Sequence, residues 1–151
     1  MPIALTKVAY TTAATAKGTR SGRVTSADGV VDFHLGQPGT YEGDPKANPE
    51  TLFAAGYAAC FQGALENRAK TQGVDTSDST VTAEVSFGQS EDGGYGLAVE
   101  LRVFIPGVDP AQARKLVHLA HGFCPYSKAT RGNIDVTLTV EQSAPHLVAD
   151  H

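Results

Sequence analysis

The chain has 151 residues, of which 41% are hydrophobic and 19% are charged, and its formal net charge is -4. This length predicts one domain, residues 1–151, with its own hydrophobic core, and the balance of apolar and charged residues excludes intrinsic disorder. The acidic charge, with no cluster of Lys or Arg, argues against binding to nucleic acid or to an anionic membrane.

The chain shows neither a membrane segment nor a secretory leader. No apolar run approaches the roughly 20 residues that a membrane helix needs. The opening sequence MPIALTKVAYTTAA has no basic region followed by an unbroken apolar stretch, so we predict no signal peptide. We therefore expect a cytoplasmic protein, in which the two cysteines stay reduced and are inert, catalytic or metal-binding.

The first third of the chain predicts strands. Residues 4–16 alternate loosely and are rich in Thr, Val and Tyr, which predicts a strand that ends at the glycines of residues 18–23. Residues 23–25 and 30–35 flank the turn dipeptide Asp28-Gly29 and predict a hairpin. Glycines, prolines and charges predict a loop over residues 36–47.

A long helix follows. Asn48 suits a helix cap, Pro49 the first helical position and Glu50 the positive end of the helix dipole, and Gly73 is a plausible stop. The middle of this segment, residues 52–61, is apolar on every side, which is typical of a buried helix. Small residues recur in it at spacings of three and four, so another helix can approach closely.

The second half predicts a hairpin, a helix and a last strand. Residues 80–89 and 97–105 alternate well and are joined by the turn sequence of residues 91–94. A helix is predicted from Asp109-Pro110 to about Phe123, a short turn or helix over 125–131, and a strand over 134–141. We predict an α+β fold with antiparallel strands around one long buried helix, and a mobile tail over residues 143–151.

Cys60 lies in the most apolar helix. A buried free cysteine is usually an inert core residue. A nucleophilic cysteine needs a cation nearby to hold it as thiolate. The helix N-terminus is too distant to help, since ten residues span roughly 15 Å. Arg20 and Arg23 are candidate cations, although both positions also suit solvated charges at a sheet edge.

Cys124 lies in a second distinctive stretch, residues 121–127. The sequence Cys-Pro-Tyr resembles the glutaredoxin motif, but here it follows a helix near the chain end and not the first strand of a βαβ unit. His118, His121 and Cys124 are spaced by three and could share a helix face as zinc ligands. Structural zinc usually takes four ligands, so this is a weak metal signal.

Three blocks of sequence resemble the organic hydroperoxide resistance (Ohr) proteins of the Ohr/OsmC superfamily. They are GTRSGR at residues 18–23, NPETLFAAGYAACF at 48–61 and CPYSKATRGNIDV at 124–136. The likeness runs from about residue 4 to 141, and the last two blocks have the form of the Ohr branch and not of the OsmC branch. Thr19 stands where the family commonly has a second glycine, and the tail after Glu141 exceeds the usual family ending.

The resemblance implies an intertwined homodimer with two active sites at the subunit interface. By this resemblance Cys60 is the peroxidatic cysteine, which becomes a sulfenic acid, and Cys124 is the resolving cysteine, which condenses with it to a disulfide. Arg20 holds the thiolate and polarises the peroxide, and Glu50 orients Arg20.

The resemblance also implies the substrates and the reductant. Bulky organic and fatty-acid hydroperoxides are reduced to alcohols, and dihydrolipoamide or lipoylated proteins reduce the disulfide, with no metal or bound cofactor. The apolar residues Phe53, Tyr57, Phe61 and Phe123 suit a greasy substrate pocket. Two alternatives stay open: a non-catalytic dimeric binding module with inert cysteines, and the weak zinc site at His118, His121 and Cys124.

Glu50 and Cys60 are ten positions apart in one predicted helix. Ten residues advance roughly 15 Å and rotate the side chain about 1000°, so the two side chains are neither close nor on one face. Because the resemblance puts both in one active site, we expect Glu50 of one chain to lie beside Cys60 of the other in a twofold dimer.

Overall fold

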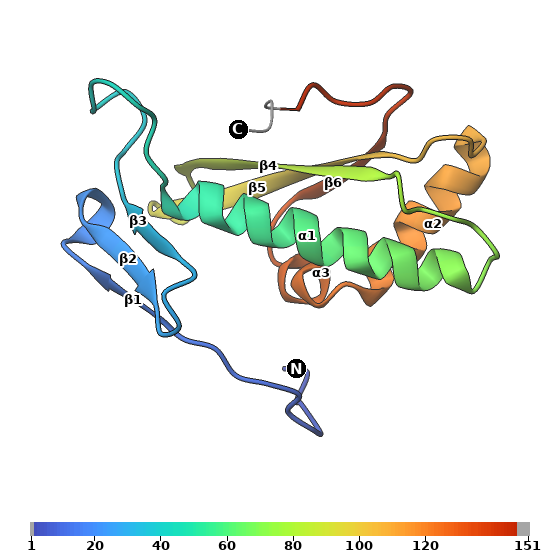
Figure 1. Cartoon of the computed structure of the whole chain (residues 1–151), viewed down its shortest axis with the longest axis horizontal. Helices are drawn as coiled ribbons and strands as arrows, with labels where there is room; N and C mark the ends of the chain where they lie inside the picture. The colour runs from blue at the N-terminus through green and yellow to red at the C-terminus, as the bar shows by residue number, and fades with distance from the viewer. Residues whose placement is uncertain (1, 148–151) are drawn as a thin grey trace. The chain divides into compact units, whose positions relative to one another are not determined.

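The computed structural model describes residues 2–147 and divides the chain into two compact units, residues 1–49 and 50–151 (Figure 1). The first unit is a small sheet. The second contains the helices and a second sheet. The expectation of a single domain over residues 1–151 stays a prediction.

The first unit is an antiparallel sheet in the order β1-β2-β3. Its elements are β1 (Ala14–Lys17), the 3-10 turn η1 (Thr19–Ser21), β2 (Arg23–Ser26) and β3 (Asp32–His34). The predicted hairpin is confirmed. The carboxylate of Asp28 accepts hydrogen bonds from the Ser26 hydroxyl and the Val30 amide, and Gly29 takes a positive φ of 76° in the turn.

The strand predicted over residues 4–16 is wrong in its extent. Only Ala14–Lys17 is a strand. Residues 4–13 are exposed and lie outside it, although the Ala13 carbonyl oxygen accepts from the Ala27 amide at 2.9 Å. The physical reason lies in the neighbouring strand, since β2 offers only four residues to pair with. A strand needs such a partner for its backbone groups, whatever its own side-chain pattern.

The second unit places helices over one face of the sheet β4-β5-β6 (Figure 1). The elements in chain order are α1 (Pro49–Lys70), β4 (Thr80–Gln89), β5 (Tyr95–Phe104), α2 (Pro110–Phe123), α3 (Pro125–Thr130) and β6 (Val136–Val140). The carboxylate of Asp109 caps α2 by accepting from the amides of Ala111 and Gln112. Gly73, with φ 70°, ends the turn that follows α1, as predicted.

The predicted α+β fold class is confirmed, but the pairing of β6 with β5 is parallel, whereas antiparallel strands were expected. Val99 pairs with Val136, and the chain between them crosses over through α2 and α3. A parallel neighbour requires such a crossover, which a hairpin turn cannot supply. The β4–β5 hairpin is antiparallel, as predicted.

Strict alternation places the core on one face of this sheet. In β5 the side chains of Val99, Leu101 and Val103 are buried against the helices. The helices contribute Phe61 and Leu65 from α1, together with apolar residues of α2, to the same core. The buried side chains of the strand, which recur at every second residue, therefore pack in one layer against the buried faces of the helices.

One side of α1 is exposed. Thr51, Ala55, Ala59 and Gly63 recur every four residues and are all exposed, while Tyr57 and Phe61 are fully buried on the other side. Residues four apart lie on one helix face, so these positions form a stripe of small side chains. We call these four residues the small-residue stripe.

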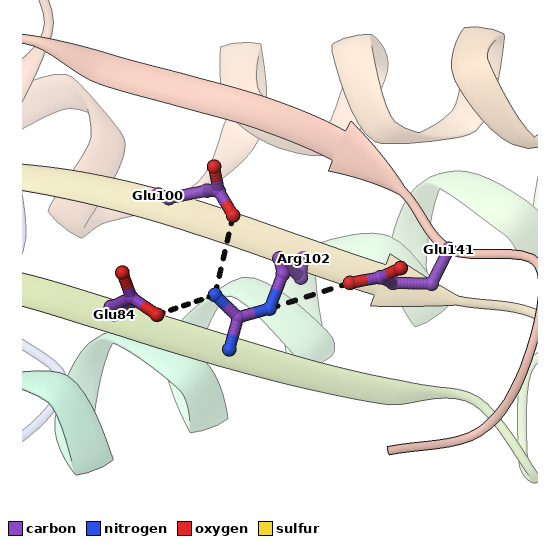
Figure 2. Close-up of polar contacts among 4 residues, drawn as sticks. All are labelled: Glu84, Glu100, Arg102 and Glu141. Carbon is purple, nitrogen blue, oxygen red and sulfur yellow. Dashed lines mark hydrogen bonds and ion pairs between the residues drawn. The ribbon is translucent and has the colours of Figure 1, made fainter.

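The opposite face of the second sheet carries an ion network around Arg102 (Figure 2). Its guanidinium contacts Glu84 of β4 at 2.7 Å, Glu100 of its own strand at 3.2 Å and Glu141, next to β6, at 3.3 Å. Arg102 thus bridges all three strands on the side away from the core. Residues 143–145 of the predicted tail line a recess of about 290 Å³ beside it, and residues 148–151 lie outside the described part of the chain.

Over residues 2–147, no helix combines the length and the apolarity needed to cross a bilayer.

Candidate functional site

Two free cysteines lie side by side in the second unit. Cys60 is half-buried in the middle of α1, and Cys124 is fully buried at the junction of α2 and α3. The Cys124 thiol donates to the Cys60 sulfur across 3.5 Å. A disulfide needs about 2.05 Å between the sulfurs, so the two can bond after a small approach. The folding of distant segments thus brings together the two cysteines that the sequence singled out.

The environment of Cys60 opposes its ionisation. Burial raises the pKa of the Cys60 thiol, and the neighbouring Cys124 raises it further. A hydrogen bond from the backbone amide of Tyr126 acts in the other direction and lowers this pKa, without cancelling the effect of burial. A working thiolate therefore needs a cation in addition to these groups.

Aromatic rings gather next to Cys60. The ring of Phe53 stacks on Tyr126 with 6.2 Å between centroids and meets Tyr57 edge-on at 5.7 Å. Gly56 makes room for Tyr126, because a Cβ at this position would lie 3.1 Å from the Tyr126 hydroxyl oxygen. Phe53 and Tyr57, expected from the sequence to line a pocket, belong to this group, and Tyr126 is an addition to it.

The other two expected pocket residues lie elsewhere in the second unit. Phe61 is fully buried in the core cluster that connects α1 to the sheet. Phe123, at the end of α2, is 40% exposed, and the Arg68 guanidinium lies 4.3 Å from the centre of its ring.

Arg20 lies in η1 of the first unit, on a tight turn. Gly18 and Thr19 both take left-handed conformations, with φ of 85° and 58°. Gly22 closes the turn, and a Cβ there would lie 1.9 Å from the Lys17 carbonyl oxygen. The glycines quoted in the first sequence block are therefore required by the backbone that carries Arg20. Glu50 is half-buried in the first turn of α1 in the second unit, and α1 runs without interruption from there past Cys60.

Four polar residues lie together next to the cysteines, and the sequence did not predict that they form a group. The Tyr57 hydroxyl contacts Ser127 at 2.8 Å and Thr130 at 3.0 Å, and His121 Nδ1 contacts the Ser127 hydroxyl at 2.9 Å. One signal was available: Ser127 and Thr130 are spaced by three in the short segment after Cys124, so their hydroxyls share a face. Nothing in the sequence showed that this face meets Tyr57.

The zinc alternative finds no support in the geometry. Among residues 2–147 no three His, Cys, Asp or Glu side chains are grouped so that they could hold a metal ion, and that includes His118, His121 and Cys124. Instead, His121 is engaged with Ser127. Burial lowers the pKa of His121, as do the nearby charges of Arg131 and His118, which favours a neutral imidazole.

Comparison with known proteins identifies the family. The model of the family described as OsmC-like protein matches residues 41–139. The organic hydroperoxide resistance protein OhrB of Bacillus subtilis is 50% identical over 134 residues, which cover 87% of this chain and 98% of the relative. The organic hydroperoxide resistance protein of Xanthomonas axonopodis pv. citri is 50% identical over 142 residues, covering 89% and 96%.

Solved structures agree with the sequence relatives. The crystal structure of Bacillus subtilis OhrB superposes with a TM-score of 0.84 at 48% identity, covering 89% of this chain and all of that one. A Vibrio cholerae organic hydroperoxide resistance protein, with captopril bound in one of its active sites, gives a TM-score of 0.82 at 41% identity, covering 93% and 97%. The family model, the sequence relatives and the solved structures agree. The chain therefore belongs to the OsmC-like family, in the branch of the organic hydroperoxide resistance proteins.

Proposed function

We propose that this protein is a thiol peroxidase that reduces organic hydroperoxides to alcohols in the cytoplasm. The observation that carries the proposal is the pair of free thiols, Cys60 and Cys124, 3.5 Å apart at a largely buried position. The names of the relatives, organic hydroperoxide resistance proteins, agree with this chemistry.

In the proposed first step the Cys60 thiolate attacks the terminal oxygen of the hydroperoxide. The O–O bond breaks and an S–O bond forms. The alkoxide leaves and takes a proton to become the alcohol. Cys60 is thereby oxidised by two electrons to a sulfenic acid. The partial exposure of Cys60 gives the peroxide access, and the full burial of Cys124 favours Cys60 as the sulfur that attacks the peroxide.

The second step joins the two sulfurs. The Cys124 sulfur attacks the Cys60 sulfenic acid, the S–O bond breaks, and the hydroxyl leaves as water with the thiol proton. A dithiol then reduces the disulfide and is itself oxidised to a cyclic disulfide. We propose dihydrolipoamide or a lipoylated protein as this dithiol, following the family resemblance.

Arg20 is the cation that we assign to the thiolate. Burial raises the pKa of Cys60, and the Tyr126 amide does not compensate, so a permanent positive charge is needed. We propose that Glu50 orients the Arg20 fork through paired hydrogen bonds. Phe53, Tyr57 and Tyr126 supply an apolar surface that favours an organic substituent on the peroxide over hydrogen peroxide.

We also propose that the working form is an intertwined homodimer. The first unit exposes large apolar side chains, with Leu5 and Tyr10 at 80% and 85%, and α1 exposes its small-residue stripe. Apolar surface of this kind usually meets a partner. A twofold dimer in which the stripes of two α1 helices cross would bury them and bring Glu50 of one chain toward Cys60 of the other.

The test is a turnover assay with tert-butyl hydroperoxide and with hydrogen peroxide, each with dihydrolipoamide or thioredoxin as electron donor. We expect the organic peroxide and dihydrolipoamide to be preferred. Cys60→Ser should abolish turnover. Cys124→Ser should permit one turnover and accumulate the Cys60 sulfenic acid, detected by mass spectrometry. Full multiple turnover by Cys60→Ser would contradict the mechanism and favour the rival reading of a binding module with inert cysteines.

A further inference from the structure

The four polar residues beside the cysteines form a closed network of hydrogen bonds. Ser127 and Tyr57 are fully buried, and Thr130 is 6% exposed. Besides the contacts of Tyr57 and His121 given above, the Thr130 hydroxyl donates to the Ser127 carbonyl oxygen at 3.3 Å. We call these four residues, Tyr57, His121, Ser127 and Thr130, the hydroxyl clasp.

A count of hydrogens gives the clasp a direction. Each hydroxyl carries one hydrogen, and a carbonyl oxygen only accepts. If Thr130 donates to the Ser127 carbonyl, Tyr57 donates to Thr130 and the Ser127 hydroxyl donates to Tyr57. The fourth contact is then filled only by a hydrogen on His121 Nδ1. This is the one assignment that gives each of the four contacts its own hydrogen, and it requires a proton on His121 Nδ1.

The clasp joins the three helices that hold the cysteine pair. Tyr57 comes from α1, three residues before Cys60. His121 comes from the last turn of α2, three residues before Cys124, and Ser127 lies in α3, three residues after it. The Tyr126 amide that reaches the Cys60 sulfur is in the same short helix. A second tie supports the junction, because the Arg131 guanidinium donates to the His121 carbonyl at 2.8 Å.

We propose that Ser127 and His121 are positioning residues for disulfide formation, holding α3 on α1 so that Cys124 stays within reach of Cys60. The inference rests on the proposed peroxidase function. The 3.5 Å between the sulfurs leaves only a short approach to a bond, and the clasp maintains that distance while Cys60 is a sulfenic acid. Neither residue touches the peroxide. Their loss acts on the second step, in which the S–O bond breaks, the S–S bond forms and water leaves.

The first arm of the test separates the two steps in single turnover with one equivalent of tert-butyl hydroperoxide. In Ser127→Ala and His121→Ala we expect sulfenic acid to form at most severalfold more slowly than in the wild type, through any shift of the Tyr126 amide in α3. Disulfide formation should slow about tenfold or more, since small misplacements of reacting groups are costly. Excess peroxide should then convert more Cys60 to the sulfinic acid.

The matched variant is His121→Asn. Its side-chain amide nitrogen takes the place of Nδ1 and can donate to Ser127, so disulfide formation should return toward the wild-type rate. An Asn variant that behaves as the Ala variant does would mean that a hydrogen-bond donor at the Nδ1 position does not hold the clasp. The ¹⁵N spectrum of His121 in the wild type should show the proton on Nδ1, and in Ser127→Ala that preference should weaken.

The second arm needs no peroxide. Equilibration of the reduced protein with a dithiothreitol redox buffer measures the effective concentration of the two thiols toward each other. We expect it to fall about tenfold in Ser127→Ala and His121→Ala, and to recover in His121→Asn. Wild-type effective concentrations in all three variants would overturn the clasp proposal, as would equal losses in both chemical steps. A wild-type protein inactive toward organic peroxides, with the shifts in effective concentration intact, would overturn the proposed function and leave the clasp.

Discussion

At the scale of single residues, the proposed nucleophile Cys60 is half-buried, and the cation that we propose for it, Arg20, lies far from it in the sequence. Burial raises the pKa of Cys60, and the Tyr126 amide opposes this effect only in part. A half-buried thiol is protected from indiscriminate oxidation but reacts slowly until a cation stabilises its thiolate. If Arg20 is the activating cation, as we propose, the reactivity of Cys60 should depend on it more than it would for an exposed cysteine.

The first prediction concerns Arg20→Ala. Removing the cation should raise the pKa of Cys60, so that less thiolate is present at neutral pH and the pH profile of the peroxide step moves to more alkaline values. The rate at pH 7 should fall about tenfold for each unit of the shift. Arg20→Lys should restore part of the rate, since it keeps the charge and loses the planar fork. Thiol titration by absorbance measures the pKa, and an unchanged pKa in Arg20→Ala would mean that another group is the activator.

At the scale of elements, the turn η1 determines how Arg20 is presented. Gly22 has no room for a side chain, since a Cβ would meet the Lys17 carbonyl oxygen at 1.9 Å. Thr19 has a side chain in a left-handed conformation that β-branched residues rarely adopt. The same turn therefore has no room for a side chain at Gly22, whereas at Thr19 it accepts a side chain at the cost of a strained backbone conformation.

The second prediction uses this contrast. Gly22→Ala should disrupt the turn and lower peroxidase activity about as much as Arg20→Ala does, with the circular dichroism of the helices unchanged. Thr19→Gly is the matched control. It removes a strain of roughly 1 kcal/mol and adds backbone entropy of similar size, so stability and activity should stay near the wild-type values. Wild-type activity in Gly22→Ala would show that the turn does not position Arg20.

The contact between α1 and Tyr126 gives the third prediction. Gly56→Ala should stabilise the helix by roughly 1 kcal/mol through its better propensity. The added Cβ would press on the Tyr126 ring at 3.1 to 3.2 Å and displace the amide that bonds to Cys60. The melting temperature should therefore rise while the rate of the peroxide step falls severalfold. A variant that gains stability and keeps full activity would show that the Tyr126 amide is unimportant.

The sequence predicted where helices and strands form better than it predicted which of them pair or pack together. The helix from Pro49 and the helix from Pro110 follow directly from the residues that open each helix, and the first also from its apolar middle, all of which are local signals. The length of the first strand depends on its partner β2, and the parallel pairing of β6 depends on β5. The side-chain pattern of a strand alone therefore cannot predict either. The meeting of Cys60 with Cys124 was likewise inferred from family resemblance, because the spacing of two residues in different helices does not determine their distance. The clasp was missed for the same reason.

At the scale of the whole molecule, the length of α1 bears on the proposal that each active site takes Glu50 from one chain and Cys60 from the other. α1 is continuous from Glu50 past Cys60, so ten residues separate them along roughly 15 Å of one helix. A glutamate side chain cannot span that length. The small-residue stripe, exposed on the same helix, offers a surface on which a second copy can cross.

The fourth prediction tests this crossing by mixing subunits. Glu50→Ala and Cys60→Ser chains are each inactive alone. Refolded together in equal amounts, they should recover about a quarter of the wild-type activity, because half of the dimers are mixed and each mixed dimer has one intact site. The inverse control mixes wild-type chains with the double mutant Glu50→Ala/Cys60→Ser, whose mixed dimers should be inactive. The opposite pair of results would place Glu50 at the Cys60 of its own chain.

The parallel pairing of β6 with β5 has a consequence for the order of folding. The β4–β5 hairpin closes over a short turn and can form early, whereas β6 can add to the sheet only after α2 and α3 have crossed over it. Cys124 lies within this crossover, between α2 and α3, whereas Cys60 precedes the hairpin in the chain. We therefore expect the two thiols to meet late in folding, when the crossover forms.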